Sequence, residues 1–195
     1  KCFAKPLADA IASHASADHH TLADVGAGSP YVATACQQAM PQLTNIKLVD
    51  RENGMKYVRE MLSDDLDRFE LCSQDFFQAI PAADIYNISN TAHDWSESEY
   101  IEIMSNVRKS MSPNSFVCIH EPLLIDEWYN EKEWCDALWM ACYAVTLFRL
   151  TQGKGSCYSI DEHDAIQQQV GLSRIGPPIP TIDGCTALFY AVESD

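Results

Sequence analysis

Basic residues are scarce in this sequence. It has 13 lysines and arginines against 28 aspartates and glutamates, so its formal net charge is −15 at pH 7 with histidine neutral. A nucleic-acid-binding protein needs clustered lysine and arginine to neutralise phosphates. The charge balance therefore argues against a nucleic-acid partner and fits a protein that acts on a neutral or cationic small molecule.

Closely spaced metal ligands and disulfide patterns are also missing. The eight cysteines are spread singly, without a Cys-x-x-Cys pair, and the two adjacent histidines, His19 and His20, stand in a polar stretch that we interpret as solvent-exposed. We therefore predict no metal site, and buried reduced thiols such as Cys118 in place of disulfides.

Long apolar runs are absent too: none could span a membrane, and no secretory signal is visible. We therefore expect a cytoplasmic protein without a membrane partner. The composition, 47% hydrophobic and 21% charged, is that of a globular domain. A length of 195 residues suits one domain with one core.

Apolar runs that suit strands alternate with amphipathic stretches that suit helices. Strands are predicted at 21–25, 45–50, 69–74, 83–90, 116–124, 172–176 and 187–193, and helices at 1–15, 31–40, 51–62, 96–111, 131–150 and 160–170. Five repeats of this alternation indicate a mostly parallel sheet with helices on both faces. Only the turn segment 176–184 separates the last two strands, so we expect an antiparallel hairpin at one edge.

The first strand ends in a glycine-rich turn, which runs from Asp24 through Gly26 and Gly28 to Pro30. In an open parallel sheet, ligands bind beyond the carboxyl ends of the strands, and glycines let the backbone approach a ligand closely. The glycines alone would fit NAD equally well, or a purely structural turn. Pro30 stands where a dinucleotide fingerprint has its third glycine, which disfavours NAD.

Acidic and aromatic residues close the next two strands. Asp50 closes the second strand, where an acid can accept hydrogen bonds from both ribose hydroxyls of an adenosine. Asp75 and Phe76 close the third, and they offer an acid for a polar edge and a ring that packs on a purine. Asp50 and this pair favour an adenosine-containing cofactor. Arg51 and Ser89 are further candidate cofactor-binding residues.

Five segments together resemble the plant-type (caffeate- and acetylserotonin-like) O-methyltransferase family: LADVGAGSP, LVD, DFF, AHDWSESEYIEIMSNVRKSMSPNS and HEPLL. The resemblance runs from about Phe3 to the last strand. Its most specific part is His93-Asp94-Trp95, which an acidic helix and a turn follow before the Glu-Pro strand.

This resemblance implies a Rossmann-like class I methyltransferase domain over the whole chain, with a seven-stranded sheet and S-adenosylmethionine as cofactor. In the family a helical dimerisation domain comes first, and the sequence lacks it, so we expect the C-terminal part of a longer, homodimeric protein. The resemblance places Gly26 and Gly28 at the methionine part of the cofactor. It places Asp50 at the ribose, and Asp75 with Phe76 at the adenine.

Methyl transfer to a hydroxyl needs alignment and a base, because a phenol with a pKa of about 10 is a poor nucleophile while protonated. Histidine titrates near neutrality and suits this role. We predict His93, on the loop after the fourth strand, as the base, with Glu121 orienting its imidazole as the family's matching glutamate does. Asp94 either holds the loop or takes a direct part. The expected acceptor is a small aromatic or polyketide-like metabolite, and S-adenosylhomocysteine is the product.

Two positions depart from the family pattern. Cys157 stands where the family often has a second acid, and Ser89 stands where it commonly has a lysine. The missing acid leaves open a protein that binds the same cofactor but catalyses another reaction. A non-catalytic binding or dimerisation module is also open.

The stretch 131–150 combines tryptophan, tyrosine, leucine and methionine. Its apolar residues cover more than one face of a helix, which suits core packing and contact with a missing domain or subunit. The resemblance adds Trp139, Met140 and Tyr143 as candidate contacts to the methyl acceptor.

Overall fold

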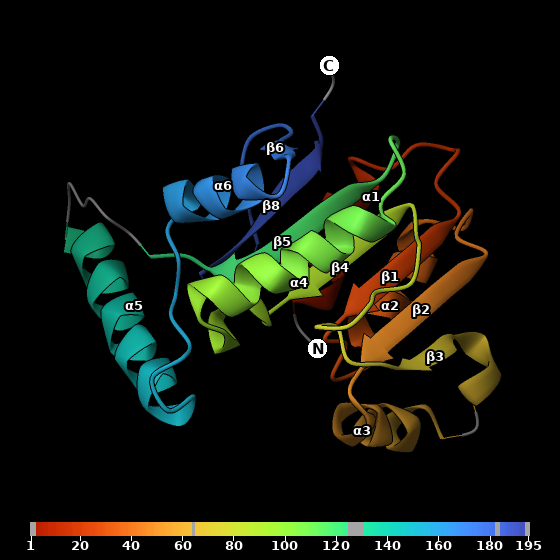
Figure 1. Ribbon diagram of the computed structural model, residues 1–195, viewed down its shortest axis with the longest axis horizontal. Coiled ribbons are helices and arrows are strands. Elements are labelled where there is room, and N and C mark those ends of the chain that lie inside the picture. The colour runs from red at the N-terminus through yellow and green to blue at the C-terminus, as the bar shows by residue number, and fades with distance from the viewer. Residues whose placement is uncertain (1–2, 64, 125–130, 182–183, 194–195) are drawn as a thin grey trace.

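The computed structural model describes residues 3–63, 65–124, 131–181 and 184–193, with the backbone alone for 131–138 (Figure 1). The strands are β1 (Thr21–Val25), β2 (Asn45–Asp50), β3 (Glu70–Ser73), β4 (Ile85–Ser89), β5 (Phe116–Pro122), β6 (Leu172–Arg174), β7 (Ile179–Pro180) and β8 (Cys185–Val192). The helices are α1 (Ala4–Ala12), α2 (Tyr31–Ala39), α3 (Glu52–Leu62), α4 (Glu97–Ser110), α5 (Glu131–Leu150) and α6 (Ile160–Gln169), with the 3₁₀ turns η1 (Leu66–Arg68) and η2 (Ala92–Asp94).

All of these strands belong to one sheet, whose order is β3-β2-β1-β4-β5-β8-β6, with β7 paired to β8. The two-residue β7 is added to the seven strands expected. β1 to β5 run parallel, whereas β8 is antiparallel to both β5 and β6. The predicted α/β class and mostly parallel sheet are confirmed. β1 and β4 are neighbours although β2 and β3 separate them in sequence. The strand order reverses between β1 and β4, which is where such sheets bind ligands.

The antiparallel hairpin at the end of the sheet is also confirmed, with two added details. β8 lies between β5 and β6, because its apolar centre, Leu188 to Tyr190, is buried and fits an inner position, while the three-residue β6 forms the edge. The segment 176–184 is not only a turn, since it contains the short β7. Its prolines carry no N–H and are unusual in strands, so the sequence pattern did not predict β7.

Helices cover both faces of the sheet. On one face α1, α2 and α3 pack side chains such as Leu7 and Met55. On the other, α4 and α6 pack Met104 and Ile166, and α4 crosses in front of the sheet in Figure 1. Ser96 caps α4 through a capping box with Glu99, because the two side chains satisfy each other's backbone N–H groups.

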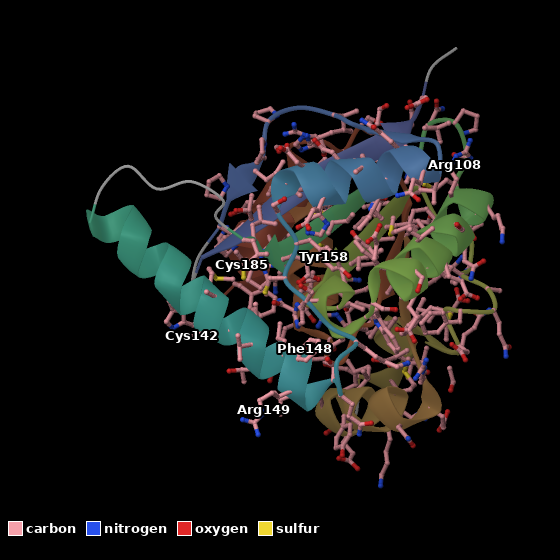
Figure 2. All side chains as sticks on the ribbon, turned by 60° about the vertical axis from the view of Figure 1, so that its left-hand side comes forward. Arg108, Cys142, Phe148, Arg149, Tyr158 and Cys185 are labelled. Atoms are coloured by element: carbon pink, nitrogen blue, oxygen red, sulfur yellow. The ribbon has the colours of Figure 1, made fainter. Side chains whose placement is uncertain are left out.

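α5 stands at one side of these layers (Figure 1). Met140 and Leu147 are buried on its inner face. Val145 and Phe148 are exposed, and Arg149 points away from the body (Figure 2). The expectation that apolar residues cover more than one face of this helix is confirmed.

The interpretation of His19 as solvent-exposed is wrong, whereas His20 is exposed as predicted. The His19 ring is buried because Nδ1 accepts a hydrogen bond from the Ser16 backbone, and Nε2 donates one to the carbonyl oxygen of Asn114. Ser16 lies in the same turn as His19, whereas Asn114 is distant in the sequence. A sequence pattern around His19 cannot reveal the contact with Asn114.

The expectation of buried thiols holds for Cys36, Cys118 and Cys157, but Cys142 is exposed on α5. No helix in the described ranges is long and apolar enough to cross a membrane. Within the same ranges, no cluster of three or more histidine, cysteine or acidic side chains could hold a metal ion.

Candidate active site

The glycine turn lies at the carboxyl end of β1, beside the loop that follows β4. Gly26 has φ +72° and Gly28 has φ +54°, the left-handed region that glycine adopts without strain. A Cβ atom on Gly26 would lie 2.5 Å from the Thr91 hydroxyl oxygen. Only glycine therefore lets the two loops approach this closely.

A cavity of about 240 Å³ opens over this turn. It is lined by Phe3, Asp24, Gly26, Ala27, Gly28, Ser29, Val32, Ser89 and Asn90. The lining includes four predicted cofactor-binding residues, from β1, the glycine turn and the end of β4.

Asp24 gives this cavity an unusual carboxylate. Its Oδ1 accepts a hydrogen bond of 2.7 Å from the Asn87 amide, while the buried Oδ2 has no hydrogen-bond partner within the described part of the chain. Burial raises the pKa of Asp24 to about 7; the Asn87 hydrogen bond opposes this rise, and the charge of Asp50 adds to it. An unpartnered buried carboxylate oxygen requires a donor, so the cavity fits a cationic group such as the ammonium of an amino acid.

Asp50 is fixed at the end of β2. Its Oδ2 accepts from the Gly28 N–H at 2.9 Å, and its Oδ1 accepts from the Arg51 N–H at 2.7 Å. Sequence reasoning missed Gly54: a Cβ atom there would overlap the Asp50 carboxyl group. The detectable signal is a glycine four residues after the acid, where the first helical turn folds back over it.

Arg51 lies in a group of aromatic rings next to this acid. Its guanidinium carbon is 5.3 Å from the Phe76 ring centroid, 5.4 Å from that of Phe77 and 5.0 Å from that of Trp95. Its Nε is 3.7 Å from Asp75 Oδ1. The structure therefore brings the predicted Arg51, Asp75 and Phe76 together, and it adds Phe77 and Trp95. Phe76 is buried, so Phe77 and Trp95 present more ring surface.

His93 and Glu121 form a buried pair at the ends of β4 and β5. Glu121 Oε2 lies 2.5 Å from His93 Nδ1, and Oε1 accepts from the backbone N–H groups of Thr91 and Ala92, both at 2.8 Å. The predicted partnership is present, and the same carboxylate also holds the loop. Asp94 Oδ1 lies 3.8 Å from His93 Nε2.

The pKa of His93 is raised above its ordinary value of about 6.5. Burial alone would lower this pKa, but the hydrogen bond and charge of Glu121, with the charge of Asp94, outweigh the burial. Because Glu121 binds Nδ1, the imidazole is held in one orientation with Nε2 toward Asp94.

α5 brings aromatic rings to the imidazole. The Tyr143 ring lies 6.0 Å from the His93 ring, and Trp139 stacks on Tyr143 with ring centroids 5.6 Å apart and planes inclined by 7°. Met140 is buried in a cluster with Cys157. Of the three predicted acceptor contacts, Tyr143 therefore lies beside the His93 ring, Trp139 stacks on Tyr143 and stays exposed, and Met140 is buried.

Cys157 does not substitute chemically for an acid. Burial raises its thiol pKa to about 12, and the charge of Glu121 adds to this rise. Its segment contacts the backbone of His93 through Gly155, which sequence reasoning missed: a Cβ atom there would overlap the carbonyl oxygen of His93. Lys154 holds the same segment through an ion pair with Glu99.

Comparison with known proteins identifies the family. Residues 7–171 match the O-methyltransferase domain family. The chain belongs to this O-methyltransferase family. Members use S-adenosylmethionine, for which Asp24 and the glycine turn provide a suitable cavity.

Relatives of this O-methyltransferase domain include enzymes named for mitomycin biosynthesis and for phenazine methylation. It is 30% identical over 155 residues to the mitomycin biosynthesis 6-O-methyltransferase of Streptomyces lavendulae. This alignment covers 78% of this chain and 41% of the relative. It is 31% identical over 107 residues to the phenazine O-methyltransferase PhzM of Lysobacter antibioticus, covering 53% of this chain and 31% of that enzyme.

Solved structures of O-methyltransferases share the fold. The mitomycin 7-O-methyltransferase MmcR superposes with a TM-score of 0.79 at 25% identity, covering 95% of this chain and 53% of that one. Human N-acetylserotonin methyltransferase gives a TM-score of 0.79 at 17% identity, covering 96% and 52%. The chain thus spans about half the length of the proteins it matches.

Proposed function

We propose that the complete protein transfers the methyl group of S-adenosylmethionine to a hydroxyl group of a small aromatic or polyketide-like metabolite. The observation that carries this proposal is the buried His93–Glu121 pair at the edge of the sheet where the cofactor cavity opens. The relatives named for mitomycin and phenazine methylation support the acceptor class.

The cofactor would be held by residues at the ends of four strands, β1 to β4: Asp24, Gly26, Gly28, Asp50, Arg51, Asp75, Phe76 and Ser89. When bound, S-adenosylmethionine supplies an electrophilic methyl group on a sulfonium sulfur. Asp24 and Ser89 suit the methionine part because they line the cavity. Asp50 suits the ribose, and the rings around Arg51 suit the adenine.

His93 acts as the general base. Glu121 accepts the hydrogen on Nδ1, so neutral His93 has its free lone pair on Nε2 and can take the proton of an acceptor hydroxyl. As the imidazole becomes charged, Glu121 and Asp94 stabilise the imidazolium. Trp139, Met140 and Tyr143 shape the acceptor pocket beside it.

Replacing His93 tests this role. We expect His93→Ala in the complete protein to lower kcat at least about 100-fold, in line with the usual contribution of a general base. Calorimetric binding of S-adenosylhomocysteine should change less than threefold, because the cofactor cavity does not include His93. Full activity of the variant would refute the mechanism. Cofactor binding without methylation of any hydroxyl acceptor would favour a different reaction on the same fold.

We also propose that the complete protein is a cytoplasmic homodimer, assembled through a helical domain that precedes this chain. Exposed Val145, Phe148 and Leu150 on α5 support a covered apolar face in the assembled protein. Light scattering should give a dimer for the complete protein and a monomer for residues 1–195. A monomeric complete protein would refute this assembly.

A further inference from the structure

His120 is a buried histidine that the proposed chemistry does not use. It lies on β5 directly before Glu121, and its side chain reaches the opposite face of the sheet. There Nδ1 lies 2.9 Å from the Ser89 hydroxyl, and Nε2 lies 2.8 Å from the Thr181 hydroxyl. The Phe3 ring stacks on the imidazole at 5.6 Å between centroids. The ring is therefore fixed on both edges and on one face.

These contacts are consistent with one direction for each hydrogen bond. The Thr181 hydroxyl donates its single hydrogen to the carbonyl oxygen of Cys185 at 3.0 Å. With its hydrogen directed to that carbonyl oxygen, which also accepts from the Thr181 N–H at 2.9 Å, the hydroxyl accepts at the imidazole, and Nε2 of His120 carries a hydrogen in this arrangement. Burial lowers the pKa of His120 to about 4, so the ring is neutral near pH 7 and its Nδ1 is bare. The Ser89 hydroxyl must then donate to Nδ1.

The orientation of the Ser89 hydroxyl affects the cofactor cavity, because Ser89 and Asp24 both line it. The Ser89 hydrogen is committed to His120, and the Asn90 amide donates to the same oxygen at 3.3 Å. Ser89 Oγ therefore offers the cavity a lone pair and no hydrogen. Asp24 Oδ2 likewise lacks a donor among the described residues. Ser89 Oγ and the ionised carboxylate of Asp24 are then two acceptors in one cavity, and together they favour an ammonium group over a carboxylate.

We propose that His120 is a positioning residue, which holds the Ser89 hydroxyl as a hydrogen-bond acceptor for the ammonium group in the methionine part of the cofactor. This inference rests on the proposed cofactor site and deepens it. Thr181 sets the orientation of the imidazole, and the imidazole sets the orientation of the hydroxyl. The result is a cavity whose hydrogen-bond polarity is fixed before the ligand arrives.

The tautomer is tested first, with ¹⁵N-labelled histidine in the ligand-free protein. NMR should show His120 as the tautomer with hydrogen on Nε2 and a bare Nδ1. Thr181→Val should remove this preference, and Thr181→Ser should retain it. A hydrogen on Nδ1 of His120 in the unaltered protein would overturn the proposal, because Ser89 could then donate to a ligand.

Ligand binding is tested by calorimetry with S-adenosylhomocysteine and with its deaminated analogue, which lacks the α-amino group. We expect Ser89→Ala and His120→Phe each to weaken S-adenosylhomocysteine binding about tenfold, a typical effect of losing a hydrogen bond to a charged group. The double variant should lose no more than either single one, since both act through one contact. Binding of the deaminated analogue should stay within twofold.

These outcomes separate the two proposals. If the unaltered protein does not bind S-adenosylhomocysteine, the cofactor site itself is wrong. If it binds, but the variants weaken both ligands equally or neither ligand, the cofactor site stands and the role of His120 is refuted. Should His120→Phe fail to fold, Thr181→Val supplies the same comparison with a smaller change, and Thr181→Ser supplies its matched control.

Discussion

Glu121 combines two tasks in one carboxylate, because one oxygen binds the imidazole and the other holds the backbone of the loop. Glutamine in its place retains an acceptor for the two backbone N–H groups. Its amide group, however, would donate to Nδ1 of His93 and move the ring hydrogen to Nε2. The base would then have its lone pair on the wrong nitrogen.

We expect Glu121→Gln to lower kcat about 10²–10⁴-fold, the range known for loss of the carboxylate behind a catalytic histidine. Because the carboxylate raises the pKa of His93, its removal lowers this pKa. The rate rises with pH as the base loses its proton, so the acidic limb of the profile should move to lower pH. The pH dependence of kcat/KM measures both effects. An unchanged limb would mean that Glu121 does not tune the base.

The buried Asp24 carboxylate is expected to lower the stability of the ligand-free protein while it favours binding of the cofactor. Its pKa is about 7 in the folded protein, against an ordinary value of 3.8. The folded state therefore holds a proton that the unfolded state releases, so stability falls as pH rises between these two values. Above about pH 7 the carboxylate is buried, charged and only partly hydrogen-bonded.

We expect Asp24→Asn to raise the Tm of the ligand-free protein at pH 8 by several degrees and to weaken S-adenosylhomocysteine binding at least tenfold. Differential scanning calorimetry and titration calorimetry measure the two effects. The exposed Asp18→Asn serves as control and should change neither quantity. A lower Tm for Asp24→Asn at pH 8 would contradict the assignment of a destabilising buried charge.

At the scale of elements, the sequence predicts strands and helices well and their contacts poorly. The helix 131–150 was predicted with the bounds of α5, and the Ser96–Glu99 cap was visible as a local pattern. The pairing of His93 with Glu121, the proposed base and its partner, could be predicted from a family motif. By contrast, Gly155 and His120 contact residues far away in the sequence, so no periodicity or spacing reveals them.

The segment between α5 and α6 is an example of such a contact. Gly155 passes against the carbonyl oxygen of His93, and an added methyl group would displace one of the two chains. We expect Gly155→Ala to lower kcat about 10–100-fold, because small displacements of a catalytic group cost this much. Adjacent Ser156→Ala, whose hydroxyl bonds the Cys157 carbonyl oxygen, should stay within twofold in steady-state assays. Equal effects of the two variants would argue against this contact.

At the scale of the whole molecule, the cavity lies where the ends of β1 and β4 meet the loops that follow them, so a ligand there links the two halves of the sheet. A ligand that binds only the folded state raises its stability by about 2.7 kcal/mol at 100 times its Kd. We expect S-adenosylhomocysteine to raise the Tm in this way, and NAD at equal concentration to leave it unchanged. Thermal unfolding followed by circular dichroism measures both. A larger shift with NAD would refute the cofactor assignment.

Glu121 fixes the backbone of the loop that carries His93. The same carboxylate also raises the pKa of the His93 imidazole. Folding of this loop and the pKa of the proposed base are therefore coupled through one carboxylate. A distortion anywhere in this loop should register as a change in basicity. Evolution can vary the acceptor-facing surface of α5 without this constraint, since that surface contributes no hydrogen bond to the acid in the described structure. New acceptors can thus be accommodated while the proton-transfer unit stays the same.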